Sequence, residues 1–399
     1  MHKTHQHKIT IGLVLTTVPR YSETFFRNKI KGLQNNGFNV MLFVDYVEEG
    51  DLNFPCTIVK SSNFNSNNPL RSIFNSCTSI LKSLLLHPKR SFKLYQLDKK
   101  DGLSFKKRIR NVIVNEFLLT KQLDWLHFGF GMLTNNRENV AEAINAKMAV
   151  SFRGFDLYLS PLKHKNCYDR LFLKEVKYHV LSQEMKQDVI NFNVSANKIE
   201  VIPPAINIDF FKPQTIRKSN EVVNIVTVAR LHWKKGIEYT LQAIHQLKQK
   251  GINFHYTVIG DGGQFERLTF AIYQLGLQDN VTLAGKLPQE TVRKHLEQSD
   301  IYIQYSEQEG FCNAVLEAQA MGLMCIVSNA EGLSENVLNE KTGWVIPKRN
   351  PKLLADKIVE VINLSSSKKQ NIKETAINRV REEFNLQKQN ASFVRFYKD

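Results

Sequence analysis

The chain has 399 residues, of which 42% are apolar, and this is enough for two domains of ordinary size with buried cores. No apolar stretch approaches the roughly 20 residues that cross a membrane, and residues 1–15 lack the apolar segment and cleavage site of a signal peptide. We therefore expect a cytoplasmic protein. The five cysteines form no CxxC pair, which argues against a zinc site or a disulfide framework.

The net charge of +16 is concentrated in the first half of the chain. Residues 1–210 contain 29 basic and 18 acidic residues, and residues 60–121 contain 13 and 3. Because apolar clusters are interspersed with these cations, the segment 60–121 could lie on an anionic membrane surface. A solvated basic surface is the plain alternative. Nucleic-acid binding is a third possibility, weakened because no zinc finger, RNP-like motif or basic zipper accompanies the charge.

The first 45 residues have the pattern of a strand, a helix and a second strand. The apolar run KITIGLVLTT predicts a buried parallel strand, ETFFRNKIKGLQNNG predicts a helix that ends near Gly37, and FNVMLFV predicts the next strand. Together they form a βαβ unit. Further β-like runs, separated by helix-length stretches, indicate one parallel sheet within a domain of residues 1–205. These runs lie at residues 124–128, 148–152, 178–182 and 199–202.

A second domain is predicted after a linker. Residues 203–221 interrupt the pattern with three prolines and a polar stretch, and the linker is assigned to 206–221. Alternating strands and helices restart at VNIVTVA and continue to GWVIP and the helix PKLLADKIVEVINL. We expect a wound α/β domain at 222–367, with ligands at the carboxyl ends of its strands. Residues 368–399 are predicted to form a helical tail that packs back on the body.

The segment SEQEGFCNAVLEAQAMG contains two glutamates, Glu309 and Glu317, separated by seven residues. Glu309 is expected on a loop after a strand. A helix is expected to begin near Cys312 and Asn313, with N–H groups at its start that can bind an anion. Glu317 then lies about one turn into the helix, roughly 6 Å further along its axis. Two carboxylates with this spacing can accept hydrogen bonds from hydroxyls at two ends of a nucleotide sugar.

This stretch resembles the signature of glycosyltransferase family 4, in which two glutamates flank seven residues. The downstream sequence NAEGLSENVLNEKTGWVIP resembles the GGxxE and TGxLV segments of that family. The resemblance covers nearly the whole chain and is strongest between Val222 and Pro347. It implies an α/β protein with two Rossmann-like domains facing each other across a cleft, the GT-B fold. It also implies that Glu309 contacts the transferred sugar and Glu317 the ribose. The donor-binding positions implied here are Glu309, Gly310, Phe311, Cys312, Asn313 and Glu317.

The segment VTVARLHWKKG resembles the GRLxxxKG element of the family, with Arg230 and Lys235 as its cations. Two cations at the end of a strand can stabilise a leaving diphosphate, whose negative charge grows in the transition state. On their own they could be an ordinary exposed pair, and Lys234 is a weaker substitute for Lys235. In register with the two glutamates, they imply a diphosphate site that requires no metal cofactor.

Two further segments imply contacts with the nucleotide. VIGDGG places Gly260, Asp261 and Gly262 after a strand, where glycines allow either close backbone approach to a nucleotide or simply a tight turn. VTLAGKLP resembles the segment that holds the base in family members, which implies Lys286 and Leu287 as base-binding positions.

Candidate acceptor residues come from the first domain. PRYSETFF resembles the N-terminal loop of a polysaccharide-forming branch of the family, which implies Ser22, Glu23 and Thr24. A helix N-cap with an acidic first turn explains the same residues equally well. SFRGFDLY resembles the HGxD segment, with Arg153 in place of histidine and Asp156 retained. An arginine at this position acts electrostatically and does not carry a proton.

The sequence HFGFG contains His127, which is either an acceptor-side residue near the cleft or a structural histidine. IEVIPPAINIDFFKP resembles the family's hinge segment, which ends in NGVDxxxF, but Pro204 and Ala205 replace Asn-Gly. We interpret this replacement as a changed hinge turn and not as a lost activity.

These features together predict a retaining glycosyltransferase that moves a hexose from a nucleotide-diphosphate sugar to a hydroxyl of a glycan or lipid-linked acceptor in surface polysaccharide biosynthesis. Retention is implied by the family alone. A nucleotide-sugar epimerase and a non-catalytic nucleotide-sugar-binding protein are the alternatives. We expect no metal and no nucleic-acid partner, and we expect peripheral contact with the inner face of the cytoplasmic membrane. The catalytic candidates are Glu309, Arg230, Lys235, Arg153 and Asp156.

Overall fold

The structure is a computed structural model that describes residues 8–19, 24–47, 54–62, 69–214 and 221–399. The chain divides into two compact units, each with its own sheet. The first unit comprises Met1–Leu181, Lys186–Ile202 and Asn390–Asp399, and the second comprises Ser182–Met185 and Pro203–Gln389.

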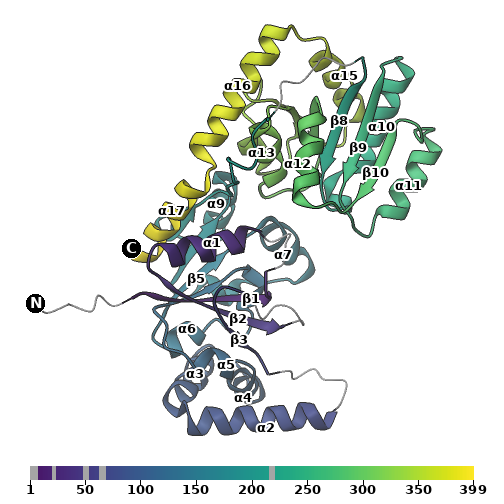
Figure 1. The fold of residues 1–399 in the computed structure, drawn as a ribbon. Coiled ribbons are helices and arrows are strands. Elements are labelled where there is room, and N and C mark those ends of the chain that lie inside the picture. Colours follow the sequence, from purple (N-terminus) through teal and green to yellow (C-terminus); the bar gives the residue numbers. More distant parts are fainter. Residues whose placement is uncertain (1–7, 20–23, 48–53, 63–68, 215–220) are drawn as a thin grey trace, which may run out of the picture. The chain divides into compact units, whose positions relative to one another are not determined.

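The sheet of the first unit has seven strands in the order β3-β2-β1-β4-β5-β6-β7, and all neighbouring strands are parallel (Figure 1). β1 is the first strand in the chain but lies inside the sheet, between β2 and β4. Ligands of such sheets bind at the carboxyl ends of the strands near this change of direction. The strands are β1 (Thr10–Thr17), β2 (Asn39–Tyr46), β3 (Thr57–Lys60), β4 (Trp125–Phe128), β5 (Lys147–Ser151), β6 (Val176–Val180) and β7 (Ile199–Val201).

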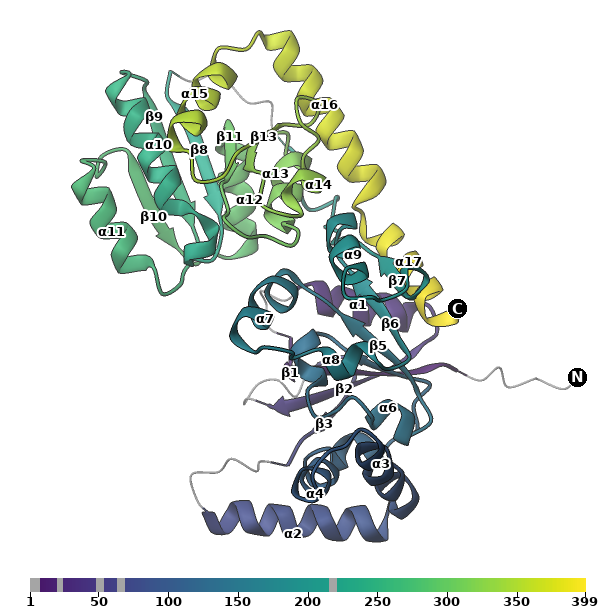
Figure 2. The same cartoon turned by 180° about the vertical axis from the view of Figure 1, so that it is seen from behind.

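Helices of the first unit cover its sheet and extend it at one edge. Between β3 and β4 the chain inserts α2, α3 and α4, which lie together beside the β3 edge in both views of the ribbon (Figure 1, Figure 2). The longer helices are α1 (Thr24–Asn35), α2 (Pro69–Leu85), α3 (Pro88–Lys100), α4 (Phe105–Val114) and α9 (Gln183–Ile190). The short ones are α5 (Glu116–Leu119), α6 (Val140–Ala143), α7 (Ser160–Lys163), α8 (Asp169–Phe172), η2 (Gly131–Thr134), the π-helical η3 (Phe155–Leu159) and η4 (Ala196–Lys198).

The core of the first unit includes the end of the chain. Helix α1 buries Phe26, Ile30 and Leu33 at helical spacing against the sheet. The last helix, α17 (Leu386–Lys398), adds Phe393 and Tyr397 to the same core, each 1% exposed. The final residues are therefore part of the first unit although the chain has passed through the second.

The sheet of the second unit has six parallel strands in the order β10-β9-β8-β11-β12-β13. β8 is its first strand and again lies inside the sheet, between β9 and β11. The two units thus repeat one arrangement, in which the carboxyl ends of the first strand and its neighbours form the candidate binding edge. The strands are β8 (Val223–Val228), β9 (Phe254–Ile259), β10 (Val281–Gly285), β11 (Ile301–Gln304), β12 (Met324–Ser328) and β13 (Trp344–Ile346).

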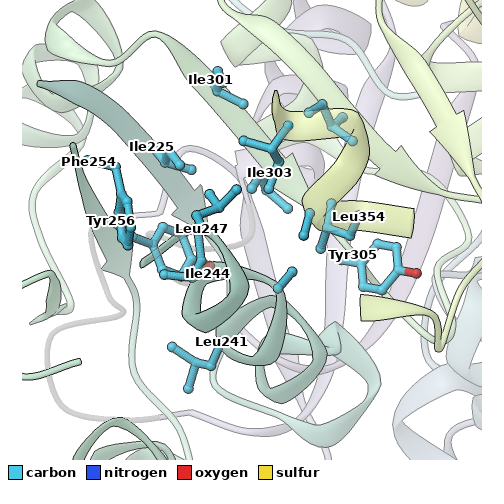
Figure 3. Close-up of a cluster of buried hydrophobic side chains, with 14 of the residues drawn as sticks. Ile225, Leu241, Ile244, Leu247, Phe254, Tyr256, Ile301, Ile303, Tyr305 and Leu354 are labelled. Carbon is cyan, nitrogen blue, oxygen red and sulfur yellow. The ribbon is translucent and has the colours of Figure 1, made fainter. Parts of the chain in front are cut away.

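The core of the second unit lies between this sheet and its helices (Figure 3). Leu241, Ile244 and Leu247 follow one stripe of α10 and are fully buried, and each contributes roughly 1.5–3 kcal/mol by burial. The helices are α10 (Ile237–Gln249), α11 (Phe265–Gln274), α12 (Gln289–Gln298), α13 (Asn313–Ala320), α14 (Leu333–Asn336), α15 (Pro351–Ile362) and α16 (Ser366–Glu383), with the 3₁₀ turn η5 (Trp233–Lys235).

The expected α/β class with two Rossmann-like domains is confirmed by these two parallel sheets. The expected cleft between the domains stays a prediction, because the positions of the two units relative to one another are not determined. Among the described helices, none combines the length and the apolar content needed to cross a membrane.

Candidate functional site

Three loops at the carboxyl ends of β8, β9 and β11 meet in the second unit. The β8 and β11 loops are joined by the Glu307 N–H, which donates to the Lys234 carbonyl at 2.7 Å. The β8 and β9 loops are joined by the Leu231 N–H, which donates to the Asp261 carbonyl at 3.0 Å. The candidates predicted from separate motifs therefore share one edge of one sheet.

Lys235 and Glu309 form an ion pair within this edge. Lys235 Nζ donates to Glu309 Oε2, and the two side chains are 14% and 13% exposed. Burial lowers the pKa of Lys235, but the Glu309 carboxylate outweighs this effect and raises the pKa above its ordinary value. The lysine is therefore firmly cationic. The sequence predicted both residues, but it did not predict that they bind each other.

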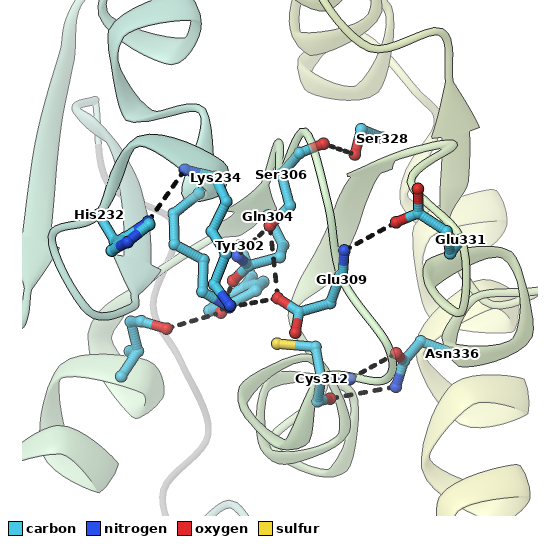
Figure 4. Close-up of polar contacts among 12 residues, drawn as sticks. His232, Lys234, Tyr302, Gln304, Ser306, Glu309, Cys312, Ser328, Glu331 and Asn336 are labelled. Atoms are coloured by element: carbon cyan, nitrogen blue, oxygen red, sulfur yellow. Dashed lines mark hydrogen bonds and ion pairs between the residues drawn. The ribbon is translucent and has the colours of Figure 1, made fainter. Parts of the chain in front are cut away.

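The backbone of the Glu309 loop is held by the loop after β12 (Figure 4). The Glu309 N–H donates to Glu331 Oε2 at 2.9 Å, and the Gly332 N–H donates to the Glu309 carbonyl at 3.2 Å. A Cβ atom on Gly332 would lie 1.9 Å from the Gly310 carbonyl oxygen, so only glycine allows the two loops to approach this closely. Sequence analysis missed Glu331 as a positioning residue, although its segment carried a family resemblance.

Helix α13 begins at Asn313, where the sequence predicted it. Its N-cap residue is Cys312, whose N–H donates to Asn336 Oδ1 at 2.9 Å and whose carbonyl accepts from Asn336 Nδ2 at 3.1 Å (Figure 4). The Cys312 side chain is buried, and the Phe311 ring packs against Phe384 at 5.6 Å. The side chains of both residues therefore stabilise the unit, and the main-chain N–H and carbonyl of Cys312 are already bonded to Asn336.

Glu317 lies in α13, one turn in from the helix start, and it is half-buried. Burial raises the pKa of this carboxyl to about 8. Within the described part of the chain, the Glu317 side chain makes no hydrogen bond or ion pair. It is therefore a mostly protonated group at neutral pH, available to a ligand.

Arg230 is exposed just after β8 and forms no ion pair with the described residues. Its positive charge is close enough to oppose protonation of Lys234 and Lys235. At Lys235 this effect is smaller than that of Glu309, so the pKa of Lys235 stays raised. For Lys234, burial is the largest cause and lowers the pKa, while Glu309 partly opposes it. The loop after β8 thus brings three cations together, of which Lys235 is paired with Glu309.

The glycines of the β9 loop are explained by contacts within the chain. Gly260 and Gly262 have φ of 147° and 154°, which side chains rarely adopt. A Cβ atom would lie 1.9 Å from the Ala229 carbonyl oxygen at the first position and 2.4 Å from that of Leu231 at the second. Close approach to the β8 loop thus accounts for both glycines, in line with the tight-turn alternative, and their predicted contact with a nucleotide stays a prediction. Asp261 Oδ1 accepts from the Gly262 N–H at 2.7 Å.

Lys286 and Leu287 follow β10 at the same edge of the sheet, the lysine exposed and the leucine half-buried. In the first unit, Thr24 is half-buried and begins α1. Ser22 and Glu23 lie outside the described residues, so their predicted acceptor role stays a prediction.

Arg153 lies over a cluster of aromatic rings in the first unit. Its guanidinium carbon is 4.2 Å from the centre of the Phe25 ring, 4.8 Å from Phe26 and 5.7 Å from Phe130. Such cation–π contacts each contribute roughly 0.5–2 kcal/mol, depending on exposure. The arginine at the position of the family histidine is therefore held by aromatic rings.

Asp156 is 2% exposed and lies close to Arg153 in the chain. Its Oδ1 accepts from the Met132 N–H at 3.2 Å, whereas Oδ2 has no hydrogen-bond partner within the described residues. Burial raises the pKa of Asp156 to about 6, although the Met132 N–H and the Arg153 charge lower it in part. Asp156 is thus a buried carboxyl that titrates near neutrality.

His127 is fully buried, which contradicts the predicted acceptor contact and favours the structural alternative. Its Nδ1 is 2.6 Å from the Tyr397 hydroxyl, and its Nε2 is 2.7 Å from Ser151 Oγ. Ser151 Oγ is in turn 2.7 Å from His179 Nδ1, and His179 Nε2 is 2.9 Å from the Ile202 carbonyl oxygen. Sequence analysis missed this network, because its members come from strands and helices far apart in the chain.

No group of three or more histidines, cysteines, aspartates or glutamates in the described residues is arranged to hold a metal ion.

Comparison with known proteins assigns a family to the second unit. Residues 209–379 match the family described as Glycosyl transferases group 1. The protein named "Putative colanic acid biosynthesis glycosyltransferase WcaL" from Escherichia coli (strain K12) is 25% identical to this chain over 396 residues, covering 94% of this chain and 96% of that protein.

Solved structures share the fold of the whole chain. A glycosyltransferase from Rickettsia africae ESF-5 superposes with a TM-score of 0.73 and 21% identity over 98% of both chains. Anabaena HepE in complex with UDP and glucose superposes with a TM-score of 0.72 and 14% identity over 98% of this chain and 99% of that one. The fold is thus the GT-B type, the second unit is a group 1 glycosyltransferase domain, and the protein is a glycosyltransferase.

Proposed function

We propose that this glycosyltransferase moves a hexose from a nucleotide-diphosphate sugar to a hydroxyl of a glycan or lipid-linked acceptor. The observation that carries the proposal is the cluster of Arg230, Lys235 and Glu309 at the carboxyl ends of β8 and β11. An excess of cations with one carboxylate among them suits a diphosphate joined to a sugar. The complex of Anabaena HepE with UDP and glucose supports a donor of this class.

Donor binding uses the Lys235–Glu309 ion pair in two ways. The ammonium group has three N–H donors, so Lys235 can maintain its ion pair with Glu309 and still donate to a phosphate oxygen. Glu309 then accepts from a hydroxyl of the sugar and fixes its orientation. Glu317 accepts from the ribose hydroxyls, while exposed Arg230 neutralises the diphosphate.

The reaction retains the configuration of the sugar and requires no metal. The acceptor oxygen forms a bond to the anomeric carbon on the face from which the phosphate oxygen leaves, and that phosphate oxygen takes the acceptor's proton. Glu309 orients the sugar and is not a nucleophile. Lys235 and Arg230 stabilise the charge that grows on the leaving diphosphate, which is the task that a metal would otherwise perform.

A Glu309→Gln variant tests the proposal. The amide still accepts from Lys235 but lacks the charge that orients the sugar, so transfer should fall on the order of 100-fold. Donor binding should remain measurable by thermal shift, since a ligand at 100 times its dissociation constant adds about 2.7 kcal/mol of stability. Glu374→Gln, an exposed glutamate of α16, is the control and should keep full activity.

Two outcomes would assign another function. A donor that changes with no acceptor present indicates an epimerase. A nucleotide sugar that stabilises the protein without any transfer, in the wild type and in the Glu309 variant alike, indicates a binding protein.

A role in surface polysaccharide biosynthesis, at the inner face of the membrane, completes the proposal. The colanic acid relative supports the pathway class, and the helices α2, α3 and α4 support membrane contact. These helices expose large apolar side chains within the basic segment 60–121, which suits an anionic membrane surface. The exposed residues are Ile80, Leu81, Leu85, Leu86, Phe92, Phe105 and Ile109.

Vesicle sedimentation tests the membrane contact. The protein should sediment with vesicles that contain anionic lipid and not with neutral ones, and each cation near the surface contributes roughly 1 kcal/mol. Leu85→Ser with Leu86→Ser, both in the exposed stretch, should weaken the binding. Equal sedimentation with neutral and anionic vesicles would contradict this contact.

A further inference from the structure

A groove runs along α4 at the carboxyl ends of β2 and β3 in the first unit. One cavity of about 670 Å³ is bounded by Tyr46 and Ser61 from these strand ends and by α4. A second cavity of about 280 Å³ shares part of this wall and continues to Met132. We call the two together the α4 groove. From α4 it is lined by Phe105, Lys106, Ile109, Arg110, Ile113 and Val114.

One end of the α4 groove is bounded by a residue that contacts the candidate Asp156. Met132 lines the smaller cavity, and its N–H donates to Asp156 Oδ1 at 3.2 Å. Asp156 Oδ2 has no hydrogen-bond partner within the described residues. The wall of the groove is therefore joined by one hydrogen bond to the buried Asp156 carboxyl.

The described residues that line the groove carry a net positive charge. Among them the one carboxylate, Asp45, is paired with Arg137 at 2.7 Å, and Arg137 also donates to Asn115 Oδ1 at 3.2 Å. Lys106 and Arg110 are exposed and form no hydrogen bond or ion pair with the described residues. Two cations thus remain for an anionic ligand.

The sequence of α4 places an apolar row beside these cations. Phe105, Ile109 and Ile113 recur every four residues, and Lys106 and Arg110 follow each of the first two by one position. Residues four apart lie on the same side of a helix, so α4 presents an apolar row and a cationic row next to each other. Phe105 is 62% exposed and Ile109 38%, so the apolar row is open to a ligand.

We infer that the α4 groove binds the part of the acceptor where a hydrocarbon chain is joined through phosphate to the glycan. Lys106 and Arg110 hold the phosphate, and Phe105, Ile109 and Ile113 contact the chain. A neutral oligosaccharide would gain nothing from either row, whereas a phosphorylated lipid uses both. The inference rests on the proposed function and specifies which of its two acceptor classes the enzyme uses.

Calorimetric titration of the full chain tests the groove directly. Dodecyl phosphate, below its micelle concentration, should bind at least tenfold more tightly than dodecyl glucoside and more tightly than inorganic phosphate. The double variant Lys106→Ala with Arg110→Ala should bind dodecyl phosphate roughly tenfold more weakly, because hydrogen bonds to charged groups are lost. Lys107→Ala is the matched control, since Lys107 is an exposed cation of the same helix that does not line the groove.

The results separate this inference from the proposed function. If the double variant and the wild type bind dodecyl phosphate equally, or if Lys107→Ala weakens it as much, the groove is not the site. Phosphate alone binding as tightly as dodecyl phosphate indicates a plain anion site. In each case, an unchanged thermal shift with the nucleotide sugar leaves the donor site intact, whereas no shift in the wild type contradicts the proposed function itself.

Discussion

At the scale of single residues, the candidate donor site is defined by the charged side chains that lie together at the carboxyl ends of β8 and β11. The spacing of Glu309 and Glu317 and the Arg230–Lys235 pair could be predicted from the sequence, because each sits in a local motif. The contact between Lys235 and Glu309 could not be predicted, because it joins loops 74 residues apart. The same holds for Glu331, whose bond to the Glu309 N–H depends on how two loops meet.

The pKa of Glu317 makes donor binding depend on pH. In the ligand-free protein burial raises the pKa to about 8, so at pH 7 only about a tenth of the molecules are ionised. Ribose hydroxyls donate to the ionised form, so binding lowers this pKa. Donor affinity should therefore rise about tenfold between pH 7 and pH 9.

Dissociation constants measured by calorimetry at pH 7, 8 and 9 check this expectation. The glutamine of Glu317→Gln cannot ionise, so the donor affinity of this variant should not rise between pH 7 and pH 9. The pKa of Lys235 lies above its ordinary value of 10.5, so this lysine stays charged between pH 7 and pH 9. The same pH dependence in the variant would assign the titration to another group.

At the scale of elements, the last helix is fastened by a directional hydrogen-bond network. A carbonyl oxygen only accepts, so His179 Nε2–H donates to Ile202, and a neutral His179 accepts from the Ser151 hydroxyl at Nδ1. Ser151 then accepts from His127 Nε2–H, and His127 Nδ1 accepts from the Tyr397 hydroxyl. This proton order requires both histidines to be neutral.

Acidification should therefore destabilise the first unit. Burial, together with the charges of Lys29 and Arg153, holds the pKa of His127 and of His179 well below its usual range. In the unfolded chain each histidine titrates near 6.5, so the unfolded state binds more protons as the pH falls. Each histidine should remove about 1 kcal/mol of stability between pH 6.5 and pH 5.5.

Hydrogen exchange of the β4, β5 and β6 amides measures this loss in the first unit alone. Tyr397→Phe keeps the ring but leaves His127 Nδ1 with only the longer contact to Lys29 Nζ at 3.5 Å, which should cost about 1–3 kcal/mol at pH 7.5. Tyr273→Phe, at an exposed tyrosine of α11, should change nothing. Protection that stays constant between pH 7.5 and pH 5.5 would show that the histidines do not control the stability.

Strands long enough to show an apolar run could be predicted from the sequence, and β1, β2 and β8 lie where such runs predict them. β3, with the sequence TIVK, was not among the predicted strands. For Gly260 and Gly262 the sequence left open whether the close neighbour is a nucleotide or the chain itself. The fold shows that the β8 loop is one such neighbour.

At the scale of the whole molecule, the sequence predicted two α/β domains because strands and helices alternate twice around an interrupted stretch. It predicted that the tail would pack on the body, since that tail is rich in aromatic residues. It could not assign the tail's partners. Residues up to Gln389 belong to the second unit and those from Asn390 to the first, a division set by contacts far apart in the chain.

The inclusion of Phe393 and Tyr397 in the core of the first unit has a consequence for biosynthesis. A ribosome makes the strands of that unit before the second unit, but the side chains that complete their packing are made only after it. The strands of the first unit therefore cannot finish folding until the second unit has been synthesised. A stop codon between Gln389 and Phe393 would remove none of these strands and would still leave their core incomplete.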